Sequence, residues 1–311
     1  MNMTHSRCID ALKAVLTVLA AVAFGGCSGE DFTAPSFLHI EGITVDISEE
    51  DPLSYNMGFY RSDVVAAYVV AHYPGEMSVD TVGLFRLPMT TPLLWDGRAD
   101  YIDIYPAVEQ SGSSKSLTPY PAYRYIRITD TTFLPTDTLD LHTLRTTYSI
   151  SRSDVLAYEM FEPTEGSLLF DSTMQWRPHA PDEACTGRGY GYVTVPDSAT
   201  YVPFYLDRDF YVTDETKNLY MELDSRSDVE YEIFMESYVV SGSNSSQKQV
   251  MRIRPSDDWV HIYVNLGRTW SEFTYNPKFR LHFRAYNLDG TGGEVRLDNI
   301  KLYTFYNSWL P

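Results

Sequence analysis

The residues of this chain that could do chemistry do not stand in the spacings that common reactions require. The signatures His-Glu-x-x-His, Gly-x-Ser-x-Gly and Cys-x-x-Cys, typical of zinc and acyl-transfer enzymes, do not occur. Cys185 has no histidine beside it to act as a base. The closely spaced glycines of Gly187-Arg-Gly-Tyr-Gly precede no helical pattern that would direct backbone N–H groups at a phosphate. We therefore predict no enzyme, no catalytic residue and no cofactor.

Acidic side chains are abundant but do not mark an active site. The 42 Asp and Glu residues could supply a pair of glycosidase carboxylates about 5 to 9 Å apart, yet no motif selects one. A hydrolase is therefore a weaker hypothesis than the two non-catalytic functions given below. His261 and His282 alternate outward on predicted strands, which favours a solvated surface for both. The net charge of −18 argues against nucleic acid as a partner, because binding phosphate requires a basic face.

Tryptophans of the C-terminal half are the other candidates for a binding role. Sugar rings stack on exposed aromatic faces, so Trp176, Trp259 and Trp270 are candidate glycan-stacking residues. Packing in the core or at an interface is the commoner role of tryptophan, and the sequence leaves both interpretations open.

Cys27 is the residue whose surroundings point most clearly to a modification. An apolar run over residues 14–26 follows Arg7 and Lys13, ends on Gly25-Gly26 and leads directly to Cys27. The run is too short to span a bilayer, which needs about 20 apolar residues. It resembles the bacterial lipobox, in which cleavage before a cysteine is coupled to lipid attachment; an ordinary cleaved secretion signal is the alternative. We expect a signal peptide over residues 1–26, a covalent lipid on Cys27 and a polar tether over residues 27–36.

The elements that follow the tether are predicted to be strands. Short apolar runs alternate with Pro, Gly and Ser turn signals, and 24 Tyr with 15 Phe favour sheets. Residues 64–70 could instead form a helix, but their β-branched content favours a strand. We expect a small antiparallel sandwich of immunoglobulin or transthyretin type over residues 37–147. The runs that predict its strands are residues 37–45, 64–71, 81–87, 101–105 and 123–128.

The second unit, over residues 148–311, shows a clearer period of two. Leu219, Met221 and Leu223 fall on one face of a strand. The same pattern recurs at residues 229–235, 260–266 and 279–285. Strands with one polar face predict an antiparallel sandwich, and about 160 residues suit a jelly roll. The fold class is therefore all-β, with two antiparallel sandwiches.

The last strand contains a change of register. Its apolar positions are odd-numbered up to Leu297 and even-numbered from Ile300, which predicts a β-bulge at Asp298-Asn299. This ending resembles the closing strand of jelly-roll modules that bind carbohydrate. In some of these the matching aspartate helps to hold a structural calcium, so the resemblance makes Asp298 a weak candidate metal ligand.

Several longer segments resemble a widespread type of outer-membrane lipoprotein of the Bacteroidota. The resemblance covers nearly the whole chain after Cys27 and implies a lipid-anchored accessory protein without catalysis. Its implied partners are an outer-membrane β-barrel protein and other lipoproteins. The matching segments begin at Ala34-Pro-Ser-Phe-Leu-His-Ile-Glu-Gly-Ile, Val82-Gly-Leu-Phe-Arg-Leu-Pro-Met, Tyr105-Pro-Ala-Val, Pro119-Tyr-Pro-Ala-Tyr, Leu219-Tyr-Met-Glu-Leu-Asp, Asp257-Asp-Trp-Val-His-Ile and Leu297-Asp-Asn-Ile.

Two functional hypotheses follow. The first is a non-catalytic, lipid-anchored subunit of an outer-membrane protein complex, associated with β-barrel assembly or surface lipoprotein export. The alternative is a surface glycan-binding lipoprotein of a polysaccharide-uptake system. In both, the protein is anchored in the outer membrane. The acidic pair Glu30 and Asp31 faintly resembles surface-export signals of the Bacteroidota and favours the cell-surface side.

Overall fold

The computed structural model describes ten stretches of the chain. They are residues 35–46, 64–72, 79–93, 99–109, 116–129, 137–162, 169–212, 217–238, 245–273 and 278–306. Cys27, its signal peptide and the tether prediction lie outside these residues, apart from the last two tether positions. None of the helices in the described stretches is long and apolar enough to span a membrane.

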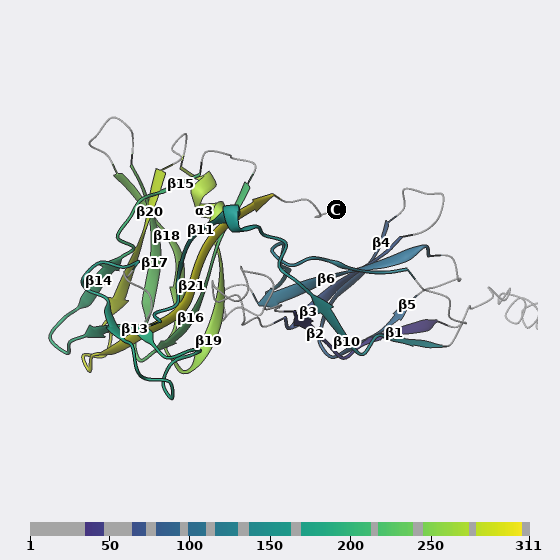
Figure 1. Cartoon of the computed structure of the whole chain (residues 1–311), viewed down its shortest axis with the longest axis horizontal. Coiled ribbons are helices and arrows are strands. Elements are labelled where there is room, and N and C mark those ends of the chain that lie inside the picture. Colours follow the sequence, from purple (N-terminus) through teal and green to yellow (C-terminus); the bar gives the residue numbers. More distant parts are fainter. Residues whose placement is uncertain are drawn as a thin grey trace, which may run out of the picture.

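The N-terminal half, at the purple and blue end of Figure 1, consists of short strands in three sheets. One sheet has the order β4-β3-β6-β7, with β8 also on β6; the second is β5-β1-β9 and the third β10-β2. The strands are β1 (Ser36–Ile40), β2 (Gly42–Val45), β3 (Ala66–His72), β4 (Val79–Arg86), β5 (Met89–Leu93), β6 (Tyr101–Glu109), β7 (Leu117–Pro119), β8 (Ile126–Ile128), β9 (Thr138–Asp140) and β10 (Thr143–Thr146).

The structure confirms strands where the sequence predicted them and adds detail. The segment that could have been a helix is strand β3, which lies between β4 and β6. The run over residues 37–45 is divided at Glu41 into β1 and β2. These two pair in parallel with β9 and β10, so the unit is not purely antiparallel. The reason is topological: the first strands of the unit lie beside its last strands and run in the same direction.

The C-terminal half is a sandwich of two antiparallel sheets. We call the sheet β12-β13-β21-β16-β19, with β11 also on β21, the interface sheet, and the sheet β14-β20-β17-β18, with β15 also on β20, the distal sheet. The elements are η1 (Arg152–Asp154), β11 (Val155–Glu159), β12 (Gln175–Arg177), β13 (Tyr190–Val195), β14 (Tyr201–Tyr205), β15 (Phe210–Tyr211), β16 (Lys217–Ser227), β17 (Tyr231–Tyr238), β18 (Ser245–Ile253), β19 (Ser256–Asn265), α3 (Gly267–Ser271), β20 (Lys278–Tyr286) and β21 (Gly293–Tyr306).

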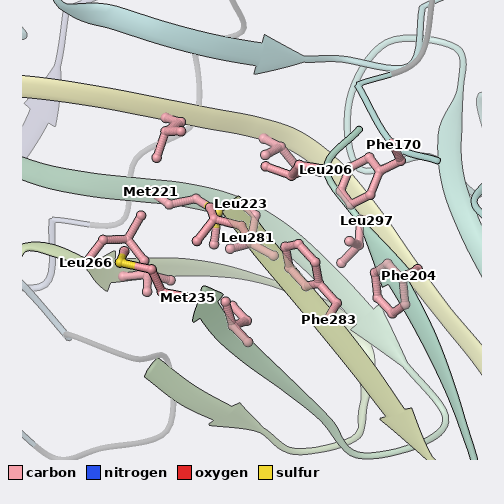
Figure 2. Packing of buried hydrophobic residues seen from close by; sticks show 14 of the residues in the cluster. Phe170, Phe204, Leu206, Met221, Leu223, Met235, Leu266, Leu281, Phe283 and Leu297 are labelled. Carbon is pink, nitrogen blue, oxygen red and sulfur yellow. The ribbon is translucent and has the colours of Figure 1, made fainter. Parts of the chain in front are cut away.

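The core of this sandwich follows from the alternation in the sequence. Inward-facing residues of β16, β17, β19 and β20 form one apolar cluster between the sheets. Figure 2 shows part of it, with Met221 and Leu223 from the interface sheet and Met235 and Leu281 from the distal sheet. Each such side chain contributes about 1.5 to 3 kcal/mol when it is fully buried. The predicted all-β fold is therefore present, and in the C-terminal half it takes the form of two sheets around one apolar core.

The predicted bulge in the last strand is also present. The register between β16 and β21 shifts between Glu222 and Asp224, opposite Asp298 to Lys301. Asn299 has a φ of 48°, in the left-handed region that asparagine tolerates better than most residues. The bulge keeps Leu297 and Ile300 on the core side of the strand.

The N-terminal half covers part of the outer face of the interface sheet. Tyr120 and Tyr123 follow β7, and Tyr148 follows β10; all three are buried against tyrosines of β16, β19 and β21. In Figure 1 strands β16, β19 and β21 of the interface sheet accordingly lie toward the N-terminal half, and strands β14, β17 and β20 of the distal sheet lie on the other side. The outer face of the distal sheet therefore points away from the N-terminal half.

Candidate functional site

The outer face of the distal sheet carries a shallow hollow of about 230 Å³. Alternate residues of β14, β17, β18 and β20 reach it because successive side chains of a strand point to opposite faces. The inward neighbours of these residues, such as Phe204 and Ala285, belong to the core. The residues that line the hollow are Pro203, Tyr205, Phe234, Glu236, Gln247, His282, Phe283 and Arg284.

Aromatic rings form two sides of the hollow. The rings of Tyr205 and His282 meet edge to face at 4.6 Å between centroids. The Arg284 guanidinium carbon lies 4.8 Å from the centre of the Phe234 ring and 5.1 Å from that of Tyr201. Tyr201 is 48% exposed, so a large aromatic surface continues from the hollow along β14.

Polar groups stand between these rings. His282 Nε2 lies 2.5 Å from Glu236 Oε2, and both side chains are 14% exposed. Burial and the nearby arginines lower the pKa of His282 against the opposing effect of Glu236, so the imidazole is mainly neutral at pH 7. Gln247, which is exposed, adds an amide at the β18 side. The hollow thus offers both donors and acceptors next to aromatic faces.

Further carboxylates and cations surround the hollow in fixed pairs. Glu232 accepts hydrogen bonds from Arg252 Nη2 at 2.6 Å and from the Tyr286 hydroxyl at 2.5 Å. Asp209 lies 2.7 Å from Lys278 Nζ and 2.9 Å from Arg280 Nη2. In each pair the carboxylate and the cation neutralise one another beside the hollow.

The outer face of the interface sheet is occupied by a buried polar network. The Glu222 carboxylate accepts hydrogen bonds from Tyr120 and Tyr148 of the N-terminal half, at 2.7 Å and 3.1 Å, and from Tyr303 of β21 at 2.5 Å. Lys301 Nζ lies 3.2 Å from the same carboxylate. Burial alone would raise the pKa of Glu222, but Lys301, His261 and Tyr303 hold it far below its ordinary value.

His261 belongs to this network, which corrects the expectation that it is solvated. It is 3% exposed, its Nδ1 lies 2.9 Å from Asp224 Oδ1 and its Nε2 lies 3.4 Å from Glu222 Oε2. Burial alone would lower its pKa, but the two carboxylates outweigh this and raise the pKa to about 9. The sequence predicted the outward direction of His261 correctly; what it did not reveal is that the N-terminal half covers this face.

Asp298, the weak candidate metal ligand, is buried beside the same network. Its carboxylate accepts the backbone N–H of Thr186 at 3.2 Å and that of Asn299 at 2.8 Å. Burial, with Asp224 nearby, raises its pKa well above the ordinary value. No group of three or more His, Cys, Asp or Glu residues within the described stretches is arranged to hold a metal ion.

The three candidate tryptophans are not brought together. Trp270 lies in α3 and is 8% exposed within the core, so it offers no face to a sugar. Trp176 packs against the core and donates its indole N–H to the Phe161 carbonyl at 2.6 Å. Trp259 is partly exposed on the interface sheet, where its indole N–H donates to the Glu183 carbonyl at 2.8 Å. None of the three lines the hollow.

The aromatic residues of the hollow were missed because they are tyrosine and phenylalanine rather than tryptophan. The sequence Tyr201-Val-Pro-Phe-Tyr does contain a signal, since Phe204 is buried and Tyr201 and Tyr205 face outward. His282 faces outward on β20 as predicted, but its side chain is only 14% exposed, because it packs against Tyr205 and Glu236 instead of lying in solvent. What the sequence did not provide is the neighbouring strand that completes the hollow.

Comparisons with known proteins find partial likenesses in solved structures. No protein-family model and no curated protein matches the sequence. A family 11 carbohydrate-binding module of a cellulosomal cellulase from Clostridium thermocellum is 17% identical, with a TM-score of 0.32; the match covers 49% of this chain and 96% of the module. A carbohydrate-binding module, TmCBM61, in complex with β-1,4-galactotriose is 10% identical, with a TM-score of 0.29, over 44% of this chain and 86% of that one. A mutant of a family 29 carbohydrate-binding module is 13% identical, with a TM-score of 0.29, over 46% and 87%. At these TM-scores the likenesses carry no weight for the ligand of this chain.

Proposed function

We propose that this chain is a non-catalytic glycan-binding protein and that the hollow of the distal sheet is its binding site. The observation that carries the proposal is the combination of aromatic rings and hydrogen-bonding groups in one open depression. Tyr205 and Phe234 supply the rings, and Glu236, Gln247 and Arg284 supply polar groups between them.

This combination matches the chemistry of a sugar. One face of a pyranose ring presents C–H groups that pack on an aromatic ring, while its edge carries hydroxyl groups that both donate and accept hydrogen bonds. The hollow is shallow and lies on a sheet held by a large core, which suits a polymer passing over the surface. A chain of sugars could extend past the hollow toward the exposed ring of Tyr201.

We also propose that a lipid on Cys27 anchors the protein in the outer membrane, facing the cell surface. The support is in the sequence: the short apolar run, the small residues before Cys27 and the polar tether that follows. A glycan-binding protein in this place would serve the uptake of polysaccharides.

Affinity electrophoresis against a panel of soluble polysaccharides, followed by calorimetry with any that bind, tests the proposed site. We expect retardation by at least one polysaccharide. Replacing both Tyr205 and Phe234 by alanine should abolish it. Tyr158→Ala removes an aromatic residue that is 40% exposed on β11 of the interface sheet, and it should have no effect. If no polysaccharide in a broad panel binds, or if binding survives the double variant, the hollow is not a glycan site.

The first hypothesis from the sequence, a subunit of an outer-membrane protein complex, is a second proposal. It rests on the predicted lipid anchor and on the resemblance of segments such as Pro119-Tyr-Pro-Ala-Tyr to those of outer-membrane lipoproteins. Purification from membranes in mild detergent tests it. A β-barrel protein recovered at a fixed ratio would support a complex, whereas elution of the lipoprotein alone would argue against one.

A further inference from the structure

We propose that the sugar held in the hollow is an acidic one and that Arg284 binds its carboxylate. This inference rests on the proposed glycan-binding function and specifies the ligand class of the same site. It is drawn from the ion pairs around the hollow, from the groups that fix Arg284 and from the geometry of the guanidinium.

Arg284 differs from its basic neighbours on the distal sheet because it forms no ion pair with a carboxylate of the described residues. Arg252 lies 2.6 Å from Glu232, and Lys278 and Arg280 both pair with Asp209. Among the residues that the structure describes, no ion pair joins Arg284 to an acidic side chain. In a chain of net charge −18, an arginine on a binding surface without an acidic partner is unusual.

The carboxylate directly opposite Arg284 is already engaged. Glu232 is the cross-strand partner of Arg284 in the pairing of β17 with β20. Its Oε1 accepts from Arg252 and from Gln249, and its Oε2 accepts from the Tyr286 hydroxyl. The acid that could have neutralised Arg284 therefore serves the rim of the hollow, and the Arg284 charge remains available to a ligand.

Arg284 is also held in place. Its guanidinium stands between the rings of Tyr201 and Phe234, at 5.1 Å and 4.8 Å from their centres. Its Nε is buried and has no hydrogen-bond partner among the residues that the structure describes. A ring on each side limits the rotation of the side chain, so less entropy is lost when a ligand is bound.

A carboxylate of the ligand fits the charged and fixed guanidinium of Arg284 better than a hydroxyl group does. The planar guanidinium can donate two parallel N–H bonds to the two oxygens of one carboxylate, and such charge-assisted bonds are the stronger ones. The aromatic rings beside it would receive the sugar ring that carries the acid. A charged hydrogen bond of this kind is worth about 10- to 100-fold in affinity.

Uronate-containing polysaccharides and their carboxyl-reduced forms provide matched probes, because reduction replaces only the carboxylate by a neutral hydroxymethyl group. The full chain in mild detergent would be titrated with polygalacturonate, alginate and a glucuronate polymer, each beside its reduced form. We expect at least one acidic form to bind 10-fold or more tightly than its reduced form, with an affinity that falls as salt is added.

Substitutions test whether Arg284, and not another basic residue of the distal sheet, causes the preference for the acidic form. Arg284→Gln should remove the preference for the acidic form, and Arg284→Lys should keep part of it. Lys278→Gln removes a cation that is already paired with Asp209 and should leave the preference unchanged. Circular dichroism melting curves confirm that each variant is folded.

Two outcomes would overturn the inference and leave the proposed function intact: equal binding of acidic and reduced forms that depends on Tyr205, or an acidic preference that persists in Arg284→Gln. Failure of every uronate probe while a neutral polysaccharide of the broad panel binds would overturn the inference alone, and failure of every polysaccharide in both sets would overturn the proposed function as well.

Discussion

Raising the pH should weaken the buried network between the two halves of the chain, and His261 sets the size of the effect. The pKa of His261 is raised from 6.5 to about 9 in the folded protein. A raised histidine pKa adds stability that is fully present below the unfolded value and is lost as the pH rises through the folded value. Each pKa unit corresponds to about 1.4 kcal/mol, so the free energy of unfolding should fall by about 3 kcal/mol between pH 6 and pH 9.

Urea denaturation followed by tyrosine fluorescence at pH 6, 7, 8 and 9 measures this change. The variant His261→Gln keeps a polar side chain but cannot titrate. It should be less stable than the wild type at pH 6, and the difference between the two should shrink toward pH 9. Burial also raises the pKa of Asp298, and both proteins retain this residue, so its ionisation does not contribute to the difference between them. A wild-type free energy that is constant from pH 6 to pH 9, or an equal fall in His261→Gln, would refute the charged state assigned to His261.

Three other substitutions, one of them with a matched control, test the interface, the core and the anchor. Tyr120→Phe removes a hydrogen bond of 2.7 Å to the buried Glu222 and should lower the free energy of unfolding by about 1.5 to 3 kcal/mol; an unchanged urea midpoint would contradict the contact. Gly191→Ala would place a Cβ on the Phe161 ring and should cost about 1 to 3 kcal/mol, whereas Gly42→Ala, with open space around it, should cost far less. Cys27→Ser should abolish incorporation of labelled palmitate and release the protein from the membrane fraction, and labelling that persists would place the lipid elsewhere.

Local pattern predicted most of the C-terminal sandwich. The alternation in β16 placed Leu219, Met221 and Leu223 in the core, and the register change placed the bulge at Asp298-Asn299. Both features depend on neighbours along one strand, which a sequence displays directly.

The site depends on contacts between strands that are distant in sequence. The alternation of residues within one strand does not predict such contacts. Tyr205, Phe234 and Arg284 line one hollow although they come from three different strands. His261 was expected in solvent because its own strand makes it face outward, yet it is buried beside Glu222, to which tyrosines more than a hundred residues earlier donate hydrogen bonds. The preference for tryptophan as a sugar platform led to Trp270, which the core requires.

The occupied face of the interface sheet limits how the chain can hold a polymer. Tyr120, Tyr123 and Tyr148 pack against that face and bury part of it. The proposed binding surface of the sandwich is therefore the hollow on the distal sheet. On the proposed function, a single chain in solution would be monovalent and would hold a polysaccharide only as tightly as one hollow allows. Many chains anchored side by side would engage one polymer together, and linked sites can raise overall affinity by about 10² to 10⁴ without any new contact. The proposed lipid anchor would then contribute to the strength of binding as well as to its location.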